Sequence, residues 1–355
     1  MRFQGSLPQT TMPASTPTLQ SSPAPAPRKP ASALPDISVL IPAHNEEHFI
    51  GRCIASVLAT GWPVDHLEIL VIDHQSTDAT AMVARAAGAR VLSAERGMKI
   101  GAVRNVGLAA AHGEFVAFVD ADCTVPSTWL RTAIDILSSD SRVGAVGGGP
   151  ALAPQDGTWV ERCLAPTYGP AGIIREAVSL VTYSFIARTA LLRDLGNFNE
   201  TVLSGEDDDM SNRIRKRGLM LIAASDCRVV HHGFARTLAQ VVRKEIWHGS
   251  NHIEVRSRVD VTLGLTLLFI GSSCAALVCL GALLVAPRPL FRDALIASLI
   301  LQLAPPNLFA LKKLKRSAWQ WSLAGPMLLV GYAYFLGHAL GVLGNLRRRL
   351  AAEPS

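Results

Sequence analysis

The sequence lacks the closely spaced cysteines from which zinc sites and disulfide frameworks are built. Its six cysteines form no close pair of the metal-binding type: Cys53, Cys123, Cys163, Cys227, Cys274 and Cys279. The last two lie in an apolar stretch. Because disulfides persist mainly in oxidising compartments, we interpret all six as reduced thiols in a cytosolic setting.

Other familiar signals are also missing. The first 35 residues contain no apolar block resembling a signal-peptide core, and their richness in Pro, Ser, Thr and Ala predicts a disordered tail over residues 1–35. No internal repeat is present. No glycine fingerprint follows the first predicted strand, which disfavours a dinucleotide held on a Gly-rich turn. The net charge of +6 is modest, and we expect no nucleic-acid partner.

Composition divides the rest of the chain into three regions. At 355 residues it exceeds the size that one compact core usually serves. Residues 36–235 alternate short apolar segments with helical patterns, residues 236–258 are basic and contain an aromatic side chain, and residues 259–355 are strongly apolar. We therefore expect a catalytic-type domain, an interfacial segment and a membrane region, in that order.

Four apolar segments in the first of these regions predict the strands of an α/β fold: residues 37–42, 67–73, 89–95 and 114–120. Helical patterns separate them. Strands that are apolar throughout and alternate with helices indicate a mostly parallel sheet with helices on both faces. Asn45 is a candidate N-cap for the first helix, with Glu46 and Glu47 in its first turn.

The fourth strand ends on two carboxylates, Asp120 and Asp122, in the segment "EFVAFVDADCT" (114–124). Ligands of parallel sheets bind beyond the carboxyl ends of the strands, where Pro42, Glu46 and Asp73 would also lie. A bare acidic cleft repels a phosphorylated substrate, but a divalent cation bridging the carboxylates to a diphosphate removes the conflict. We therefore predict a cation site here, with Asp73 accepting hydrogen bonds from a base or ribose.

These motifs, in this order, resemble a family 2 inverting glycosyltransferase of the GT-A fold, the nucleotide-diphospho-sugar transferase fold, followed by a C-terminal α-helical membrane region. The resemblance covers residues 37 to about 250. "VLIPAHNEE" resembles the opening nucleotide-binding segment, and "VIDHQSTD" resembles the family's V-D-D-x-S-x-D segment, although His74 replaces the second aspartate and Gln75 the glycine. "DAD" matches the D-x-D motif, and "GEDDDMSNRIRKRG" matches the motif that carries the catalytic base.

The resemblance implies roles for particular residues. It implies donor contacts from Pro42, His44, Glu46, Asp73, Lys99, Arg104 and Asp120, with Asn105 as a further candidate near the diphosphate. It implies Mn²⁺ or Mg²⁺ bound by Asp120, Asp122 and His231, with Asp207 as catalytic base and Glu206 positioning the acceptor. The turn "GGGP" (147–150) would lie near the acceptor site.

Residues 205–218 would form a helix even without a function. Acids open the segment, basic residues close it, and Gly218 ends it. Matching the helix dipole is worth about 0.3–1 kcal/mol per charge, which explains one or two acids. It does not explain four adjacent acids, which repel one another. A carboxylate whose neighbours raise its pKa is suited to removing the acceptor proton.

The apolar C-terminal region predicts two or three membrane spans. Residues 261–286 and 323–345 are long enough to cross a bilayer, while residues 293–311 are interrupted by Pro305 and Pro306. The basic segment before them suits an anionic lipid surface. With a cytoplasmic domain and three full crossings, "RRR" (347–349) would lie outside, against the positive-inside tendency. Either the last segment re-enters or the tendency is broken.

We therefore expect a multi-pass protein of the cell envelope, in the inner membrane, with its catalytic domain in the cytoplasm. It would move a sugar from a nucleotide-sugar donor to a membrane-associated acceptor, such as a polyprenyl phosphate or another lipid. Two alternatives stay open: a processive polysaccharide synthase, and a non-catalytic nucleotide-binding membrane scaffold. The synthases carry a Q-x-x-R-W motif, but in this chain Lys244 follows Gln240 and Arg243, which favours single-sugar transfer.

Overall fold

The structure, a computed structural model, describes residues 34–165, 169–251, 261–286, 288–316 and 321–352. The tail expected over residues 1–35 therefore lies almost wholly outside the described residues. The described ranges contain ten strands: β1 (Ile37–Ala43), β2 (Leu67–Asp73), β3 (Arg90–Ser93), β4 (Phe115–Phe118), β5 (Cys123–Thr124), β6 (Val143–Gly147), β7 (Ile174–Ala177), β8 (Phe185–Arg188), β9 (Met220–Ala224) and β10 (Val230–His231).

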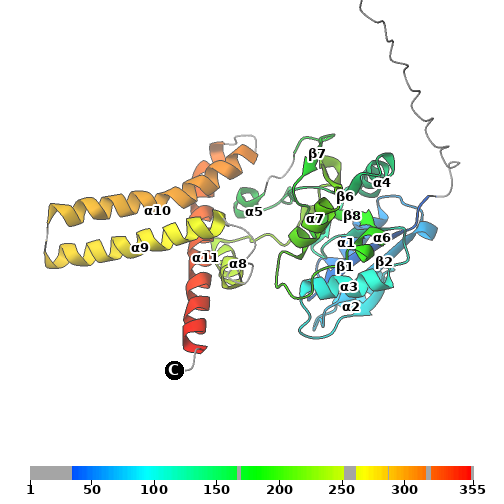
Figure 1. Cartoon of the computed structure of the whole chain (residues 1–355), viewed down its shortest axis with the longest axis horizontal. Helices are drawn as coiled ribbons and strands as arrows, with labels where there is room; N and C mark the ends of the chain where they lie inside the picture. The colour runs from blue at the N-terminus through cyan, green and yellow to red at the C-terminus, as the bar shows by residue number, and fades with distance from the viewer. Residues whose placement is uncertain (1–33, 166–168, 252–260, 287, 317–320, 353–355) are drawn as a thin grey trace, which may run out of the picture. The chain divides into compact units, whose positions relative to one another are not determined.

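Eleven α-helices accompany these strands in the described part of the chain (Figure 1): α1 (Ile50–Leu58), α2 (Thr80–Ala86), α3 (Ile100–Ala110), α4 (Trp129–Ser139), α5 (Trp159–Leu164), α6 (Thr189–Asp194), α7 (Glu206–Lys216), α8 (Leu238–Asn251), α9 (Val261–Val285), α10 (Pro289–Arg316) and α11 (Ala324–Ala352). Eight strands form one sheet in the order β3-β2-β1-β4-β8-β6-β9-β7, and β10 pairs with β5 in a small second sheet.

The first half of the sheet confirms the α/β prediction. Strands β3, β2, β1 and β4 are parallel neighbours, and β4 is buried at every position. Their carboxyl ends consequently meet at one edge. The second half is mixed, because β8 runs antiparallel to both β4 and β6, and β7 runs antiparallel to β9. The fold is therefore a mixed α/β sheet flanked by helices, only its first half wholly parallel.

Asn45 does not cap the first helix, which corrects the expectation from the sequence. The residue adopts a left-handed conformation with φ of 57°, and its Oδ1 accepts a hydrogen bond from the N–H of Thr77 at 2.8 Å. Helix α1 begins only at Ile50. Glu46 and Glu47 thus lie in a turn held against the segment between β2 and α2, which leaves Glu46 near the sheet edge.

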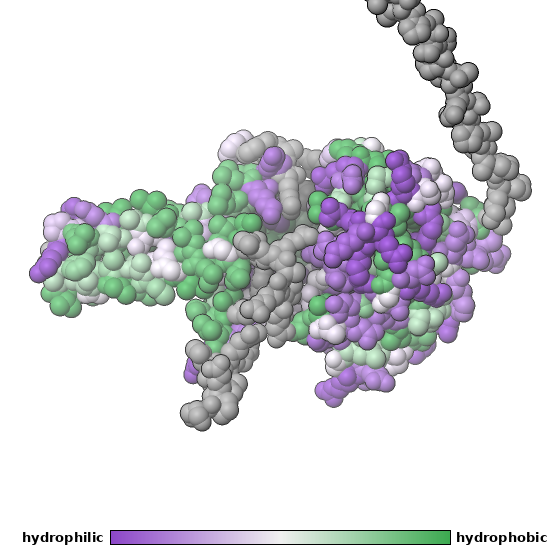
Figure 2. Space-filling view, viewed as in Figure 1, coloured by the Kyte–Doolittle hydropathy of each residue, from purple (hydrophilic) through white to green (hydrophobic). Residues whose placement is uncertain are grey.

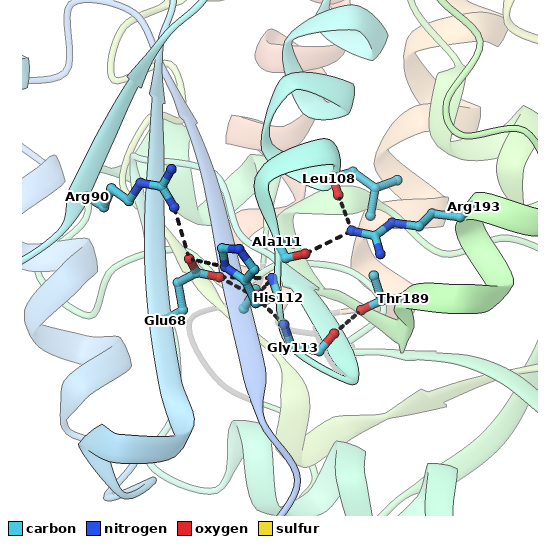
Figure 3. Close-up of polar contacts among 9 residues, drawn as sticks. Glu68, Arg90, Leu108, Ala111, His112, Gly113, Thr189 and Arg193 are labelled. Atoms are coloured by element: carbon cyan, nitrogen blue, oxygen red, sulfur yellow. Dashed lines mark hydrogen bonds and ion pairs between the residues drawn. The ribbon is translucent and has the colours of Figure 1, made fainter.

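A polar network fixes the end of α3 and the start of β4 (Figure 3). Arg193 donates to the carbonyl oxygens of Leu108 and Ala111 at 2.9 and 2.8 Å, which satisfies acceptors that a helix end leaves open. The carboxylate of Glu68 accepts from the N–H of His112 at 3.2 Å and pairs with Arg90 at 3.4 Å. These contacts fix the start of β4 from both sides. They therefore also fix the position of Asp120, which follows this strand.

The C-terminal helices pack on a second cluster of apolar side chains. Residues of α5, α8, α10 and α11 share it: Val160, Cys163, Val241, Ala310, Leu314, Met327, Val330 and Ala333, with Ala235 just before α8. Helices α9, α10 and α11 are each long and apolar enough to cross a membrane, and Figure 2 shows the apolar surface of α9 and α10. Helix α10 continues through Pro305 and Pro306, as neighbouring helices allow in membrane segments.

Candidate active site

A pocket of about 280 Å³ lies at the carboxyl ends of the parallel strands. It is lined by residues that follow β1, β2 and β4, by one side of α3 and by β10: Pro42, Ala43, His44, Glu46, His74, Ile100, Val103, Arg104, Asp120, Ala121, Asp122 and His231. Seven of the residues singled out from the sequence thus meet in one pocket. Asp73, Lys99, Glu206 and Asp207 are not among those that line it.

The small sheet explains how His231 reaches Asp122 across more than a hundred residues of chain. Its two strands pair antiparallel, with His231 opposite Cys123, and the N–H of His232 donates to the Asp122 carbonyl at 2.8 Å. The Nε2 of His231 consequently lies 3.6 Å from Oδ2 of Asp122. Together with the Cys123 thiol, these groups could hold a metal ion by their spacing.

The Arg104 side chain links the carboxylates of the predicted cation site to α7. Its guanidinium, with 5% of the side chain exposed, lies 3.3 Å from Oδ1 of Asp120 and also pairs with Glu206. Burial raises the pKa of Asp120, while the Arg104 charge lowers it and the Asp122 charge raises it. Glu206 is itself buried. The carboxylate expected to position the acceptor is therefore committed to a buried ion pair.

Glu46, which lines the pocket from the turn after β1, has a strongly raised pKa. Its N–H donates to Thr80 Oγ1 at 2.7 Å. Burial, followed by the charges of Asp122, Asp78 and Asp120, raises the pKa of Glu46 to about 7. Two of these charges, those of Asp120 and Asp122, belong to the pocket, and a divalent cation bound there would neutralise them. The crowding of carboxylates at this place is therefore suited to receiving positive charge.

His44 and Asp73 are held by the turns that follow β1 and β2. The Nδ1 of His44 lies 2.7 Å from the carbonyl oxygen of His74; because a carbonyl only accepts, Nδ1 carries the hydrogen. The Asp73 carboxylate accepts from the N–H of Ser76 at 3.3 Å. His74 stands where the family pattern has a second aspartate, and it lines the pocket.

The four acids that open α7 have different partners. Glu206 pairs with Arg104, Asp208 accepts from the Ser179 hydroxyl, and Asp209 pairs with Arg213 at 2.7 Å. Among the described residues, the Asp207 carboxylate accepts only the backbone N–H of Asp208, at 2.8 Å. Burial, then the charges of Glu206 and Asp208, raise the pKa of Asp207 to about 6.

Lys99 and Asn105 hold the loop before α7 in place. The Lys99 ammonium donates to the carbonyl of Thr201. Asn105 donates to the carbonyl of Phe198 at 2.9 Å and accepts from the N–H of the same residue at 2.9 Å. Both side chains therefore position the chain that leads into Glu206 and Asp207. Their contact with a diphosphate stays a prediction.

Sequence reasoning missed the neighbours of His231. The ring of Tyr183 lies edge-on to it at 6.3 Å, and Phe234 lies 4.6 Å away. Burial raises the pKa of Tyr183 to about 12, and the charges of Asp120 and Asp207 add to the effect. No local pattern marks Tyr183, because its place depends on the pairing of strands distant in sequence.

The comparison with known families agrees with this geometry. The profile described as Glycosyl transferase family 2 matches residues 38–185, the stretch that contains β1 to the start of β8 and both carboxylates of "DAD". Residues 38–185 form a family 2 glycosyltransferase domain. The resemblance to family 2 is thereby confirmed for these residues, and the chain is a transferase enzyme.

Relatives of the glycosyltransferase domain share a quarter to a third of its sequence. The chain is 29% identical over 234 residues to "Glycosyltransferase AglE" of Haloferax volcanii, covering 63% of this chain and 75% of that protein. It is 27% identical over 226 residues to "Pre-mycofactocin glycosyltransferase" of Mycobacterium tuberculosis, and 26% identical over 239 residues to "Beta-monoglucosyldiacylglycerol synthase" of Synechocystis sp.. Each covers 61% of this chain, but only 46% and 47% of those two proteins is matched.

Among solved structures, a mannosyltransferase from Pyrobaculum calidifontis in complex with GDP-Man and Mn²⁺ matches 91% of this chain with a TM-score of 0.50. The match covers 92% of that protein at 20% sequence identity. At this identity the likeness concerns the fold, and it confirms the GT-A expectation.

Proposed function

We propose that the chain is a membrane-bound, metal-dependent, inverting glycosyltransferase that moves a sugar from a nucleotide sugar to a membrane-associated acceptor. The observation that carries the proposal is the difference in partners among the carboxylates. Asp120 and Asp122 lie in the strand-end pocket with His231, whereas Asp207 lacks a side-chain partner among the described residues and has a pKa raised to about 6. Asp120 and Asp122 are thus suited to binding a cation, and Asp207 is suited to accepting a proton.

The transfer requires one bond to form as another breaks. The acceptor oxygen bonds to the anomeric carbon from the face opposite the donor's diphosphate, and the bond from that carbon to the diphosphate breaks. The acceptor proton passes to Asp207, and the nucleoside diphosphate departs with the bonding electron pair. A carboxylate with a pKa near neutrality is suited to such general-base catalysis.

The residues of the pocket fit a divalent cation. Asp120 and Asp122 supply carboxylate oxygens, and the Nε2 atom of His231 lies 3.6 Å from Oδ2 of Asp122. Carboxylates suit Mg²⁺ and Mn²⁺ alike, but an imidazole ligand favours the transition metal, so we infer Mn²⁺. When bound, the cation supplies positive charge to the departing diphosphate.

The membrane part supports two crossings, by α9 and α10. Of the most apolar stretch of α11, 56% is buried within the protein, against 17% for α9 and 22% for α10. Helix α11 contacts elements outside the candidate spans: Met327 and Val330 pack with α5, and Gly337 and Gly341 lie against α8.

Helix α11 would then lie along the membrane surface, across the base of the α9–α10 hairpin (Figure 1). It meets the first half of α9 through Phe269 and the last third of α10 through Leu314. Both "KKLKR" (312–316) and "RRR" (347–349) would remain on the side of the catalytic domain, in agreement with the positive-inside tendency. We infer an inner-membrane protein whose catalytic domain is cytoplasmic.

The test is metal-dependent nucleotide binding by the detergent-solubilised full chain. Calorimetric titration with GDP and with UDP, each with and without Mn²⁺, should show binding that depends on the metal. Asp122→Asn should abolish the metal dependence, whereas Asp140→Asn, which changes a partly exposed acid paired with Arg142 outside the pocket, should not. Equal Mn²⁺ dependence in Asp122→Asn and the parent would remove Asp122 from the site.

Two alternatives make different predictions for the same protein. A non-catalytic scaffold would bind nucleotide but release no nucleoside diphosphate from mixed nucleotide sugars in the presence of membranes. A processive synthase would release it and give products of many sugars, whereas the proposed enzyme adds one.

A further inference from the structure

Cavities outside the donor pocket are lined in part by the C-terminal helices. One, of about 220 Å³, has Arg162 and Lys313 in its lining and also includes His231 of the proposed cation site. A smaller one, of about 140 Å³, shares no lining residue with the donor pocket. We call it the α8 cavity, and residues of α5, α8, α10 and the segment before α8 line it: Leu164, Phe234, Ala235, Val241, Lys244, Glu245 and Lys313.

The α8 cavity contains a buried carboxylate with an unused oxygen. Only 8% of the Glu245 side chain is exposed. Its Oε1 accepts a hydrogen bond from Nδ1 of His248 at 3.0 Å, whereas its Oε2 is buried without a hydrogen-bond partner in the part of the chain that the structure describes. A buried acceptor without a donor costs free energy, and the cost is larger for a charged group. The carboxylate is therefore suited to a ligand that donates hydrogen bonds.

The two lysines that line the cavity do not satisfy this oxygen. The Lys313 ammonium donates to the Leu164 carbonyl and lies 5.5 Å from the centre of the Phe309 ring. Lys244 directly precedes Glu245 on α8, and adjacent residues of a helix do not face each other. The donor for Oε2 therefore has to come from outside the described residues.

The other walls of the α8 cavity narrow the class of ligand. Its volume exceeds the about 10–15 Å³ that one water molecule needs. A hard metal ion takes about six oxygen ligands or more, but Glu245 is the only carboxylate among the described residues of the lining. Leu164, Phe234 and Val241 are apolar. A primary ammonium group on a short alkyl chain can donate to Oε2 while its methylene groups contact these walls, whereas a quaternary ammonium has no hydrogen to donate.

The exposed side of α8 indicates that this ammonium belongs to a lipid. Arg243, Ile246 and Trp247 follow the spacing of one helix face, and all three are exposed. Cationic, apolar and Trp side chains are typical of a helix that lies in the head-group region of a bilayer. Lys244 is exposed as well as lining the cavity, so it can pair with an anionic group carried beside the ammonium. A zwitterionic lipid head group combines both charges.

We propose that the α8 cavity binds an ethanolamine phosphodiester, the head group of an aminophospholipid. Glu245 Oε2 accepts a hydrogen bond from the primary ammonium, the apolar walls contact its methylene groups, and Lys244 pairs with the phosphodiester. The lipid holds α8 at the membrane surface and is not a sugar acceptor. The inference goes beyond the proposed function, because it requires no transfer and no contact with the donor pocket.

The experiment measures lipid binding to the detergent-solubilised full chain by native mass spectrometry. Dioleoylphosphatidylethanolamine and dioleoylphosphatidylcholine share the phosphodiester and the acyl chains, and only the first has hydrogens on its nitrogen. A hydrogen bond to a charged group is worth enough that the parent should bind the ethanolamine lipid at least about tenfold more tightly. Soluble glycerophosphoethanolamine distinguishes the two sources of this head group: equal affinity for it and for the lipid would assign the site to a free ligand of the same chemistry.

Three variants test the individual contacts. Glu245→Gln keeps an oxygen that can accept from His248 and should bind both lipids alike, at the parental level for phosphatidylcholine. Lys244→Gln should weaken both lipids by a similar factor and keep the preference. Asp293→Asn, which changes an exposed acid paired with Arg292 outside the cavity, should behave as the parent does. Because an unpaired buried charge destabilises a fold, Glu245→Gln without lipid should unfold at no lower temperature than the parent.

The parent chain alone can overturn the inference, whether or not the variants fold. Equal binding of the two lipids by the parent would mean that the ammonium hydrogens are not recognised. An undiminished preference in a folded Glu245→Gln would place the ammonium elsewhere. Glycosylated phosphatidylethanolamine after incubation with mixed nucleotide sugars and Mn²⁺ would make the lipid a substrate. Mn²⁺-dependent GDP and UDP binding by the same samples reports on the proposed function separately.

Discussion

Asp207→Asn separates a catalytic role for this acid from a structural one. Asparagine keeps the size of the side chain and an oxygen that can accept the N–H of Asp208, which lies 2.8 Å from the carboxylate. It cannot take a proton at neutral pH. General-base catalysis is worth about 10²–10⁴ in rate, so transfer should fall by that factor while donor affinity stays the same, because Asp207 does not line the donor pocket.

The pH dependence of transfer gives a second readout. With a pKa of about 6, Asp207 is about one-tenth ionised at pH 5 and about nine-tenths ionised at pH 7. The base acts in its ionised form, so the parental rate should rise roughly tenfold between these values. The residual rate of Asp207→Asn should lack this rise. A metal ligand would instead show the pH dependence in donor binding.

Stability should change in the direction opposite to activity. The pKa of Asp207 rises from an ordinary 3.8 to about 6 on folding, so the folded protein holds the proton more tightly than the unfolded chain does. The stability linked to that proton is present below about pH 4 and is lost as the pH rises through 6. A rise of about two units corresponds to at most about 3 kcal/mol. With partial exposure to solvent, we expect Asp207→Asn to stabilise the fold by about 1–2 kcal/mol at pH 8.

The assay is single-turnover transfer at saturating nucleotide sugar, with thermal unfolding and donor affinity measured in parallel. Asp208→Asn and Asp209→Asn are the matched controls, since their carboxylates bind Ser179 and Arg213 and should matter for the helix rather than for the chemistry. Transfer at the parental rate by Asp207→Asn, together with loss of transfer in Asp208→Asn, would show that the role of base has been assigned to the wrong carboxylate.

Two further predictions concern the ion pairs and the membrane. Arg104→Lys keeps the charge but cannot bridge Asp120 and Glu206, so it should lower the free energy of unfolding by about 3–5 kcal/mol. Arg142→Lys, at an exposed pair, should lower it by less than about 1 kcal/mol. Chemical denaturation that gives equal losses of stability for the two variants would contradict a structural role of Arg104 in linking the two acids. For two crossings, Arg347→Cys should react with an impermeant maleimide from the catalytic side and Arg288→Cys from the other side; labelling of Arg347→Cys opposite the catalytic domain would instead indicate three crossings.

The sequence predicted those parts of the fold whose causes are local. Strands such as Ile37–Ala43 are buried at nearly every position and read as continuous apolar runs, and α7 carries acids at its start and basic residues at its end. The carboxyl ends of parallel strands meet by geometry alone, which is why Pro42, Glu46 and Asp120 were expected together. The prediction for Asn45 failed because its side chain bonds to a turn more than thirty residues away.

Contacts between residues distant in sequence could not be predicted from the sequence. Arg104 pairs with Glu206, 102 residues later, and the sequence suggested separate roles for the two. The small sheet has only two residues in each strand, too short to leave a periodic pattern, yet it brings His231 to Asp122. The cavity with Arg162 and Lys313 combines the short helix α5 with α10, a helix apolar enough to cross a membrane, and no motif spans that distance.

These long-range links have a consequence for how the site works. The proposed cation ligands Asp120 and Asp122 follow β4, while the candidate base Asp207 lies in the first turn of α7. Arg104 contacts Asp120 on one side and Glu206, the neighbour of Asp207, on the other, so we infer that one buried guanidinium sets the spacing between the proposed donor pocket and the proposed base. Transfer demands that the acceptor oxygen, the anomeric carbon and the departing diphosphate lie in line, and small displacements in such an arrangement cost large factors in rate. Loss of transfer in an Arg104 variant that stays folded and keeps its donor affinity would therefore reflect this spacing, whereas a loss of donor affinity would support the donor contact expected of Arg104.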